Sequence, residues 1–210
     1  MKAQHHFQAD TKGLGKRART RAALLDGAIS VIAEKGMADA KITDITDQAG
    51  LANGTFYNHF ADREQILREV AYSVAEEVGR EIDASISALK AAPARVVTAT
   101  WRFISLALEE PEWGSVLIGA VEHMPAIRKD VLQYLRGDLE KGIAQGVFDI
   151  NLTPFLLDQI GAMVVVSIRT QMEFGVDPGK TAETCENILR LCGQTPSAAR
   201  RAVAKALKST

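Results

Sequence analysis

Apolar residues recur at three- and four-residue spacing along nearly the whole chain, and this periodicity constrains the fold more than any other feature. Strand-like alternation is scarce, and the β-branched run at 163–166 lies inside a longer helical pattern. Glycines and prolines interrupt the pattern at intervals typical of helix ends. The sequence therefore predicts an all-α fold. We expect helices at about 17–35, 42–49, 53–59, 63–90, 94–109, 113–122, 126–144, 154–174, 179–192 and 196–207.

The predicted helices divide the chain into an arm and two domains. Residues 1–16 are expected to form a flexible basic arm, 17–78 a three-helix domain, and 79–210 a larger helical domain that shares one long helix with it. Residues 1–21 hold six basic side chains and one acidic side chain, a net charge of +5, which suits contact with phosphate. A solvated tail without a partner is the alternative.

Residues 42–60 combine a small apolar core with a tight turn. Ala49 permits close approach of two helices, and Gly50 permits the unusual backbone of the turn between them. The expected core residues are Ile42, Ile45, Ala49, Leu51, Phe56 and Phe60. The second helix carries polar or amphipathic side chains outward, which can bond phosphate oxygens and base edges. The pattern predicts a helix-turn-helix that enters the major groove of DNA. Asp62, followed by Gln65, predicts the N-cap of the next helix.

From about residue 17 to residue 78 the chain resembles the tetracycline-repressor (TetR) family. The resemblance rests on the order and spacing of Ala33-Glu34-Lys35-Gly36, Asp44-Ile45, Ala49-Gly50-Leu51, Gly54-Thr55-Phe56-Tyr57-Asn58-His59-Phe60, Arg63 and Leu67. It implies a ligand-responsive transcription regulator, a repressor, which binds a palindromic operator in double-stranded DNA as a homodimer. A small, largely apolar effector is expected to release it. A helical adaptor or ligand-binding protein without sequence-specific DNA binding is the alternative, and it predicts a featureless outer surface at 53–59.

The resemblance also implies which residues contact DNA. Ala52 and Asn53 occupy the positions where the recognition helix enters the groove, and Thr43 approaches base edges or the backbone. Arg63 stands where the family usually has lysine, and phosphate contacts are implied for Thr55, Tyr57 and His59. The full DNA-binding set is Thr43, Ala52, Asn53, Thr55, Tyr57, Asn58, His59 and Arg63.

Local alternatives remain open for several of these positions. Tyr57 can instead pack over the three-helix core. His59 can stabilise a turn as a hydrogen-bond donor, and Thr43 can serve only the first turn of its helix. The chain departs from the family pattern at Lys41, where a threonine is common, and at Thr46, where an alanine is common. These departures leave the cap of the helix at 42–49 and the base contacts open.

Beyond about residue 85, the resemblance implies a dimer interface made by the helices at 154–174 and 179–192, and an effector pocket among the middle helices. The first of these helices is apolar around much of its circumference, which predicts burial on more than one side. The expected interface residues are Phe155, Ile160, Gly161, Val164, Val165, Ile168, Cys185, Ile188, Leu189 and Cys192. The expected pocket residues are Trp101, Ile104, Leu108, Trp113, Leu117, His123, Met124, Tyr134 and Met163. Either set can instead belong to the ordinary core of one protomer.

Composition and motifs argue against other classes. The chain has no phosphate-binding glycine loop and no nucleophile elbow, and its four histidines and two cysteines lack the spacing of a zinc site. We therefore expect no enzymatic activity, no cofactor and no metal. No apolar run reaches the roughly 20 residues that span a bilayer. Cys185 and Cys192 lie seven residues apart, roughly 10 Å along a helix, too far for a mutual disulfide. The expected location is the cytoplasm, with reduced thiols and no membrane partner.

Overall fold

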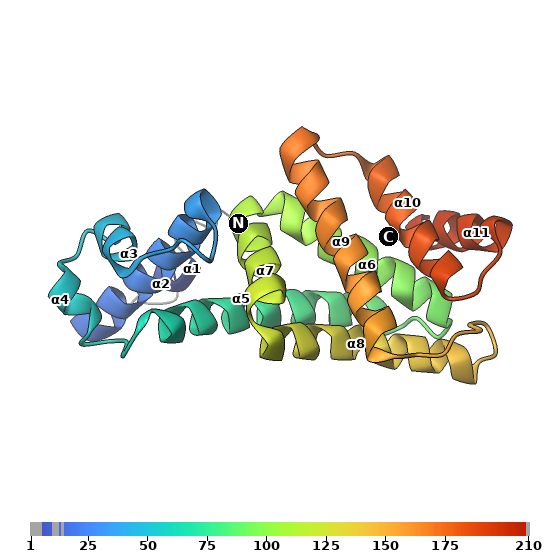
Figure 1. Cartoon of the computed structure of the whole chain (residues 1–210), viewed down its shortest axis with the longest axis horizontal. Coiled ribbons are helices and arrows are strands. Elements are labelled where there is room, and N and C mark those ends of the chain that lie inside the picture. Colours follow the sequence, from blue (N-terminus) through green and yellow to red (C-terminus); the bar gives the residue numbers. More distant parts are fainter. Residues whose placement is uncertain (1–5, 10–12, 14, 209–210) are drawn as a thin grey trace. The chain divides into compact units, whose positions relative to one another are not determined.

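The computed structural model describes residues 6–9, 13 and 15–208, and it confirms the all-α prediction (Figure 1). Every regular element of the described residues is a helix. The helices are α1 (His6–Ala9), α2 (Lys16–Lys35), α3 (Ile42–Gln48), α4 (Asn53–Phe56), α5 (Arg63–Ile86), α6 (Ala92–Glu109), α7 (Pro111–His123), α8 (Pro125–Ala144), α9 (Pro154–Phe174), α10 (Pro178–Leu191) and α11 (Pro196–Leu207).

The observed bounds differ from the predicted ones mainly at helix ends. Helices α7 and α10 begin at Pro111 and Pro178, because proline lacks only an N–H that the first turn of a helix does not use. Helix α4 ends at Phe56, and a turn occupies 57–59. The sequence pattern does not predict α1. Within the expected basic arm, residues 13, 15 and 16 are described in addition to α1. Residues 1–5, 10–12 and 14, which include Lys2, Asp10 and Lys12, lie outside the described residues.

The chain forms two compact units. Unit 1 comprises residues 1–76 and 110–128, and unit 2 comprises residues 77–109 and 129–210. Helix α5 begins in unit 1 and ends in unit 2. The domain limits predicted from the sequence stay predictions.

Unit 1 is organised around α2, which packs against α1, α3 and α7. Its buried face carries Leu24, Ala28, Ile29 and Ile32, each no more than 1% exposed. Gly27 lies where α2 meets α3. A Cβ atom at this position would lie 2.9 Å from the carbonyl oxygen of Ile45, so only glycine fits this approach.

Two polar contacts hold α2 to neighbouring elements of unit 1. The Arg21 guanidinium forms an ion pair with the Glu69 carboxylate on α5 and lies 4.7 Å over the ring of Phe60. The buried Asp26 carboxylate accepts hydrogen bonds from the backbone N–H groups of Phe7 (2.9 Å) and Gln8 (3.1 Å) in α1. Since a buried carboxylate needs such donors, α1 and α2 depend on each other.

The predicted cap of α5 is confirmed. The Asp62 carboxylate accepts a hydrogen bond of 2.8 Å from the backbone N–H of Gln65. The Gln65 side chain reaches back and accepts one of 2.6 Å from the N–H of Ala61. These two bonds satisfy donors that the first turn of a helix otherwise leaves free.

Unit 2 packs α9, α10 and α11 against α6. Its core combines residues from five helices and from the turn after α10, namely Val96, Val97, Leu139, Leu157, Ile160, Cys185, Ile188, Leu189, Cys192, Ala199 and Val203. Arg95 joins three segments of this unit. Its guanidinium lies 2.5 Å from the Asp138 carboxylate on α8 and donates to the carbonyl oxygen of Ile86 (2.8 Å) at the end of α5. In the described part of the chain, no helix is both long enough and apolar enough to cross a membrane.

Candidate DNA-binding site

A tight turn at Gly50 brings α4 against α3. Gly50 has a φ of +66°, a conformation that glycine adopts without strain. The N–H of Leu51 returns to the carbonyl oxygen of Thr46 (2.9 Å), which closes the turn. Ile45 and Phe56 fill the core beneath the two helices, and both are completely buried. The remaining faces of α3 and α4 are free to contact a partner.

The first turn of α3 is held by Asp44, because Lys41 offers no acceptor at the N-cap. The Asp44 carboxylate accepts the backbone N–H of Lys41 at 3.4 Å and pairs with the Lys35 ammonium at 2.9 Å. The hydrogen bond from Lys35 lowers the pKa of Asp44 and raises that of Lys35. The departure at Lys41 is therefore compensated within unit 1, and Thr43 beside it is exposed.

The departure at Thr46 changes the recognition helix itself. Thr46 is 1% exposed, and its hydroxyl donates a hydrogen bond of 2.8 Å to Oδ1 of Asn53, the first residue of α4. Asn53 and its neighbour Ala52 are exposed. A predicted DNA-contacting side chain is thus bonded to a buried residue of the preceding helix.

The outer surface of α4 and of the turn after it is polar. Tyr57 is 62% exposed, and its ring meets the buried Phe56 edge to face at 5.5 Å. The structure therefore places Tyr57 outside the core, against the alternative that it packs over the three helices. Asn58 is also exposed and Thr55 is half-buried. These three residues present hydroxyl and amide groups on the side of the helix-turn-helix that faces solvent.

His59 is half-buried at the end of this surface. Burial, together with the positive charges of Arg17 and Arg21, lowers the pKa of His59 below its ordinary value of 6.5. Within the described residues, the buried Nδ1 atom has no hydrogen-bond partner. The lowered pKa leaves the imidazole neutral near pH 7.

Arg63 closes the loop that follows α2. Its guanidinium donates to the carbonyl oxygens of Met37 (2.5 Å), Ala38 (2.7 Å) and Ala40 (2.5 Å). The side chain is thus used mainly within unit 1. A phosphate that contacts Arg63 would have to share the guanidinium with three carbonyl oxygens that already accept hydrogen bonds from it.

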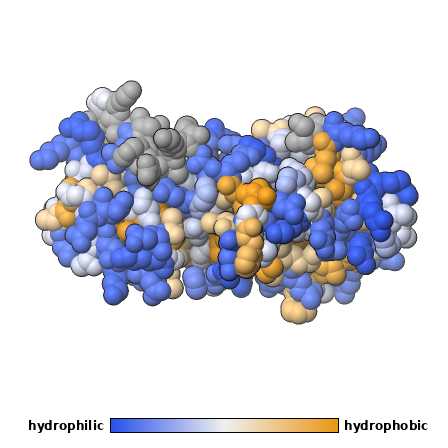
Figure 2. Space-filling view, turned by 90° about the horizontal axis from the view of Figure 1, so that it is seen from above, coloured by the Kyte–Doolittle hydropathy of each residue, from blue (hydrophilic) through white to orange (hydrophobic). Residues whose placement is uncertain are grey.

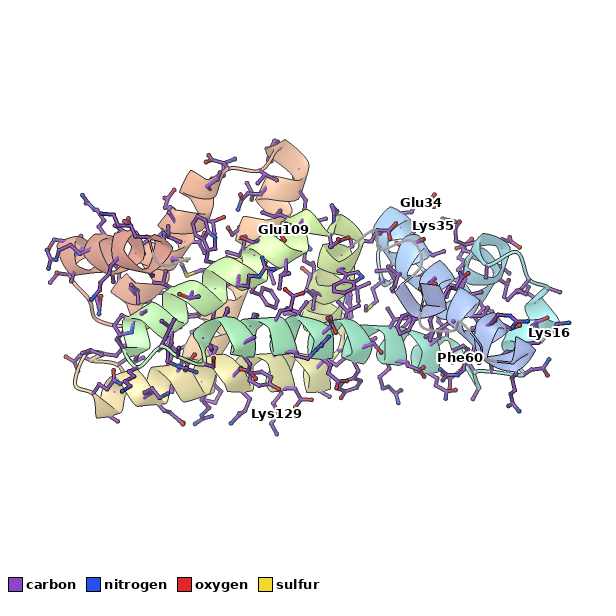
Figure 3. All side chains as sticks on the ribbon, turned by 180° about the vertical axis from the view of Figure 1, so that it is seen from behind. Lys16, Glu34, Lys35, Phe60, Glu109 and Lys129 are labelled. Atoms are coloured by element: carbon purple, nitrogen blue, oxygen red, sulfur yellow. The ribbon has the colours of Figure 1, made fainter. Side chains whose placement is uncertain are left out.

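The basic start of α2 lies beside α4. Figures 1 and 3 both place the Lys16 end of α2 next to this helix, with Lys35 at the opposite end. A contact of 3.5 Å from Arg17 to the carbonyl oxygen of Asn58 agrees with this arrangement. Arg17 and Arg19 are exposed, and Arg21 pairs with Glu69. Positive charge and the polar surface of α4 therefore occur on one side of unit 1, as a phosphate backbone requires.

The predicted pocket residues divide between the two units. In unit 1, Trp113 and Leu117 are buried, Met124 is half-buried and His123 is exposed. In unit 2, Trp101 and Met163 pack partly buried against the core. Ile104 there is completely buried, Leu108 is half-buried and Tyr134 is 65% exposed. The structure brings Trp101 and Met163 to the same core and leaves Tyr134 at the surface.

The predicted interface residues also divide, by burial. Six of them lie in the core of unit 2 and are no more than 1% exposed, namely Ile160, Ile168, Cys185, Ile188, Leu189 and Cys192. Phe155 is 71% exposed, and Gly161, Val164 and Val165 are half-buried. Burial raises the pKa of Cys185 to about 12 and that of Cys192 to about 11, so both thiols stay protonated at neutral pH. No group of three or more His, Cys, Asp or Glu side chains among the described residues could hold a metal ion.

Two short helices joined by a glycine turn, with a buried seam and a polar outer face beside basic residues, define a helix-turn-helix DNA-binding protein. Comparison with known proteins names the family. The family model described as "Bacterial regulatory proteins, tetR family" matches residues 24–70. The chain belongs to the TetR family and is a DNA-binding transcriptional regulator; this family does not consist of enzymes.

Relatives and solved structures agree with this assignment over much more of the chain. The transcriptional repressor KstR2 of Rhodococcus jostii is 27% identical over 148 residues, which cover 66% of this chain and 71% of the relative. The crystal structure of RolR in complex with resorcinol is 29% identical, with a TM-score of 0.68, over 90% of this chain and 95% of RolR. FadR of Bacillus subtilis, solved with stearoyl-CoA, shares the fold at 23% identity with a TM-score of 0.63, over 81% of this chain and 96% of FadR.

Proposed function

We propose that this regulator represses transcription by binding a palindromic operator as a homodimer, and that a small, largely apolar ligand releases it. The observation that carries the proposal is the surface of α4. Asn53, Tyr57 and Asn58 are exposed there and present hydrogen-bonding groups to solvent. The name of the relative KstR2, a transcriptional repressor, supports the direction of regulation.

The DNA contacts divide into two kinds. Asn53 at the start of α4 reads a base edge, whereas Tyr57, Thr55 and His59 contact phosphates. Phosphate contacts fix the position of the protein but carry no sequence information. Replacing Tyr57 therefore weakens binding to every duplex, and replacing Asn53 changes the preference among duplexes.

The first experiment selects genomic duplex fragments with the purified protein at moderate salt and sequences them. Recovery of a palindromic site supports an operator-binding dimer. Recovery of no enriched sequence, with binding lost at modest salt, favours the alternative of a helical adaptor. Tyr57→Ala is expected to weaken binding to all sites by similar factors, and Asn53→Ala to cost about 1–3 kcal/mol only at sites with the preferred base. Equal behaviour of the two variants contradicts the division of roles.

The proposed dimer interface uses the exposed face of α9. This helix buries Leu157, Ile160 and Ile168 in unit 2, while Phe155 and Val166 lie on the opposite face and are 71% and 62% exposed. Further exposed apolar side chains near its end are Met172, Phe174 and Val176. Figure 2 shows hydrophobic side chains gathered at the surface of unit 2. The proposed partner of this face is a second copy of the chain. When two copies are related by a twofold axis, the same residues are buried on both sides.

The proposed release mechanism uses α5. Arg21 holds the first half of this helix to α2 through Glu69. In unit 2, Arg102 holds the second half through Glu81 (2.7 Å), and Arg95 bonds the carbonyl oxygen of Ile86. A ligand that binds unit 2 and moves α6 or α8 therefore pulls on α5, and α5 moves the helix-turn-helix. The ligand must bind the two conformations with different affinity, or the equilibrium does not shift.

RolR, which was solved with resorcinol, supports a ligand of low molecular weight. The half-buried Trp101 and Met163 of unit 2 offer apolar contacts for such a molecule. Operator affinity measured against a series of small aromatic and aliphatic compounds, with resorcinol included, tests this proposal. Loss of operator binding with a change in Trp101 fluorescence supports it. The variant Trp101→Phe is the control, because its remaining fluorescence comes from the second tryptophan, Trp113. A compound that binds without changing operator affinity contradicts the release mechanism.

A further inference from the structure

The hydroxyl of Thr46 is hydrogen-bonded to the side-chain amide of Asn53. Thr46 lies in the middle of α3 and is 1% exposed, so its hydroxyl has fixed neighbours. Oγ1 lies 2.8 Å from Oδ1 of Asn53, 3.0 Å from the carbonyl oxygen of Thr43 and 3.1 Å from that of Ile42. A hydroxyl has one proton to donate, and Asn53 is its nearest acceptor. The bond therefore joins the carbonyl end of the amide to α3.

A primary amide has one end that accepts hydrogen bonds and one that donates them. In Asn53 the accepting end is bonded to Thr46, and the NH2 end remains for a partner of this exposed residue. In the major groove, guanine presents O6 and N7, thymine O4 and adenine N7 as acceptors, whereas cytosine presents only the amino group N4, a donor. An NH2 group can bond any of the first three bases and meets another donor at cytosine.

We propose that Thr46 is a positioning residue that selects which end of the Asn53 amide faces DNA, so that the operator carries guanine, thymine or adenine, and not cytosine, at the base that Asn53 reads. This inference rests on the proposed placement of Asn53 in the groove. Without the hydroxyl, the Asn53 amide turns freely about χ2, because the two ends of an amide have nearly the same shape. Either end then faces the base, and the discrimination falls.

The variants Thr46→Val and Thr46→Ser separate this role from simple packing. Valine keeps the branched shape of threonine in the buried site and removes the hydroxyl. Serine keeps the hydroxyl and removes a methyl group. If Thr46 acts through its hydroxyl, serine behaves like the wild type and valine does not. If Thr46 acts only by filling space beneath α4, the order is reversed.

The experiment first locates the base read by Asn53, as the operator position at which selection by Asn53→Ala differs from selection by the wild type. Four duplexes that differ only at this position are then titrated with each variant. For the wild type we expect guanine, thymine or adenine to be preferred over cytosine by roughly 5- to 150-fold, the range that a good base contact supplies. For Thr46→Val we expect a preference within about threefold of none, and for Thr46→Ser the wild-type preference. Adding Thr46→Val to Asn53→Ala should change the preference no further.

Three results overturn the inference. Thr46→Val retains the wild-type preference, or it weakens binding to all four duplexes equally, as loss of a phosphate contact or of packing would. A wild-type preference for cytosine has the same consequence. Urea unfolding of each variant reports its stability, and Thr46→Ala replaces Thr46→Val as the hydroxyl-free variant if valine prevents folding. If the wild type selects no operator at all, the proposed function fails first, which distinguishes the two failures.

Discussion

At the scale of single residues, two side chains at or beside the proposed recognition surface also hold the fold together. Arg63 donates three hydrogen bonds to the loop after α2, and Asp44 bonds the backbone of Lys41 while it pairs with Lys35. We expect substitutions at such positions to change both stability and DNA affinity. A variant is informative only when the two quantities are measured separately.

Replacement of Arg63 tests this overlap. Arg63→Ala leaves the carbonyl oxygens of Met37, Ala38 and Ala40 without their charged donor. We expect the free energy of unfolding to fall by about 1.5–3 kcal/mol, as measured by urea denaturation. Arg63→Lys should recover only part of this loss, because an ammonium lacks the planar fork of a guanidinium. Unchanged stability together with weakened operator binding would assign Arg63 to phosphate contact instead.

The lowered pKa of His59 predicts a dependence of stability on pH. The unfolded imidazole titrates near 6.5 and the folded one below that value. Between the two values the unfolded state binds more protons, so the contribution of His59 is fully present above about pH 6.5 and is lost as the pH falls through the folded pKa. An NMR titration should give a folded pKa below 6.5, and His59→Gln should remove this part of the pH dependence. A folded pKa at or above 6.5 contradicts the prediction.

At the scale of helices, the approach of α2 to α3 determines how the helix-turn-helix is placed. Gly27 brings the two backbones so close that a methyl group would lie 2.9 Å from the carbonyl oxygen of Ile45 and 3.4 Å from the backbone nitrogen of Ala49. Both neighbouring atoms belong to the backbone of α3 or its C-cap, so they cannot turn aside as a flexible side chain can. The position of α3 on α2 therefore depends on the absence of a side chain at Gly27.

Gly27→Ala should destabilise unit 1 and weaken operator binding, although alanine is the better helix former. The expected loss of stability is of order 1–3 kcal/mol, the usual result of overpacking. Gly137→Ala in α8 is the matched control, since a Cβ there meets nothing within 4 Å. The control should be stabilised by about 0.5–1 kcal/mol. Equal thermal stabilities of the two variants would exclude a close approach at Gly27.

The sequence could predict most helices because apolar spacing and caps are local signals. Asp62 and Gln65 identify the start of α5 correctly, and prolines mark the starts of α9 and α11. It could not predict α1, whose backbone bonds to Asp26 come from a helix many residues later. The hydrogen bond from Thr46 to Asn53 was missed for a similar reason, although a threonine where the family has alanine was a usable signal.

The two faces of α9 show the limit of periodicity. Apolar residues occur around much of this helix, so the pattern predicts burial on more than one side. It cannot tell which side belongs to the protomer. The structure assigns Ile160 and Ile168 to the core of unit 2 and leaves Phe155 and Val166 exposed. The same applies to α10, whose apolar stripe of Cys185, Ile188 and Leu189 is entirely internal.

At the scale of the whole molecule, the proposed dimer can be tested at Val166. Val166→Asp places a charge on the exposed face of α9 without entering the core. We expect the wild type to sediment as a dimer and the variant to shift toward a monomer with weaker operator binding. Val147→Asp, at a valine 41% exposed outside α9, is the control and should remain dimeric. Sedimentation analysis of the variants decides the question, and a dimeric Val166→Asp would remove this face from the interface.

In the proposed release mechanism, helix α5 serves as a lever. Its 24 residues span about 36 Å at 1.5 Å per residue. If one end of such a lever tilts by about 5°, the other end travels about 3 Å, close to the 3.4 Å between successive base pairs. Under the proposed release mechanism, a small tilt in unit 2 would therefore become a displacement of about one base-pair step at the helix-turn-helix. The sensitivity of the proposed switch would then depend on the stiffness of this helix as much as on the affinity for the effector.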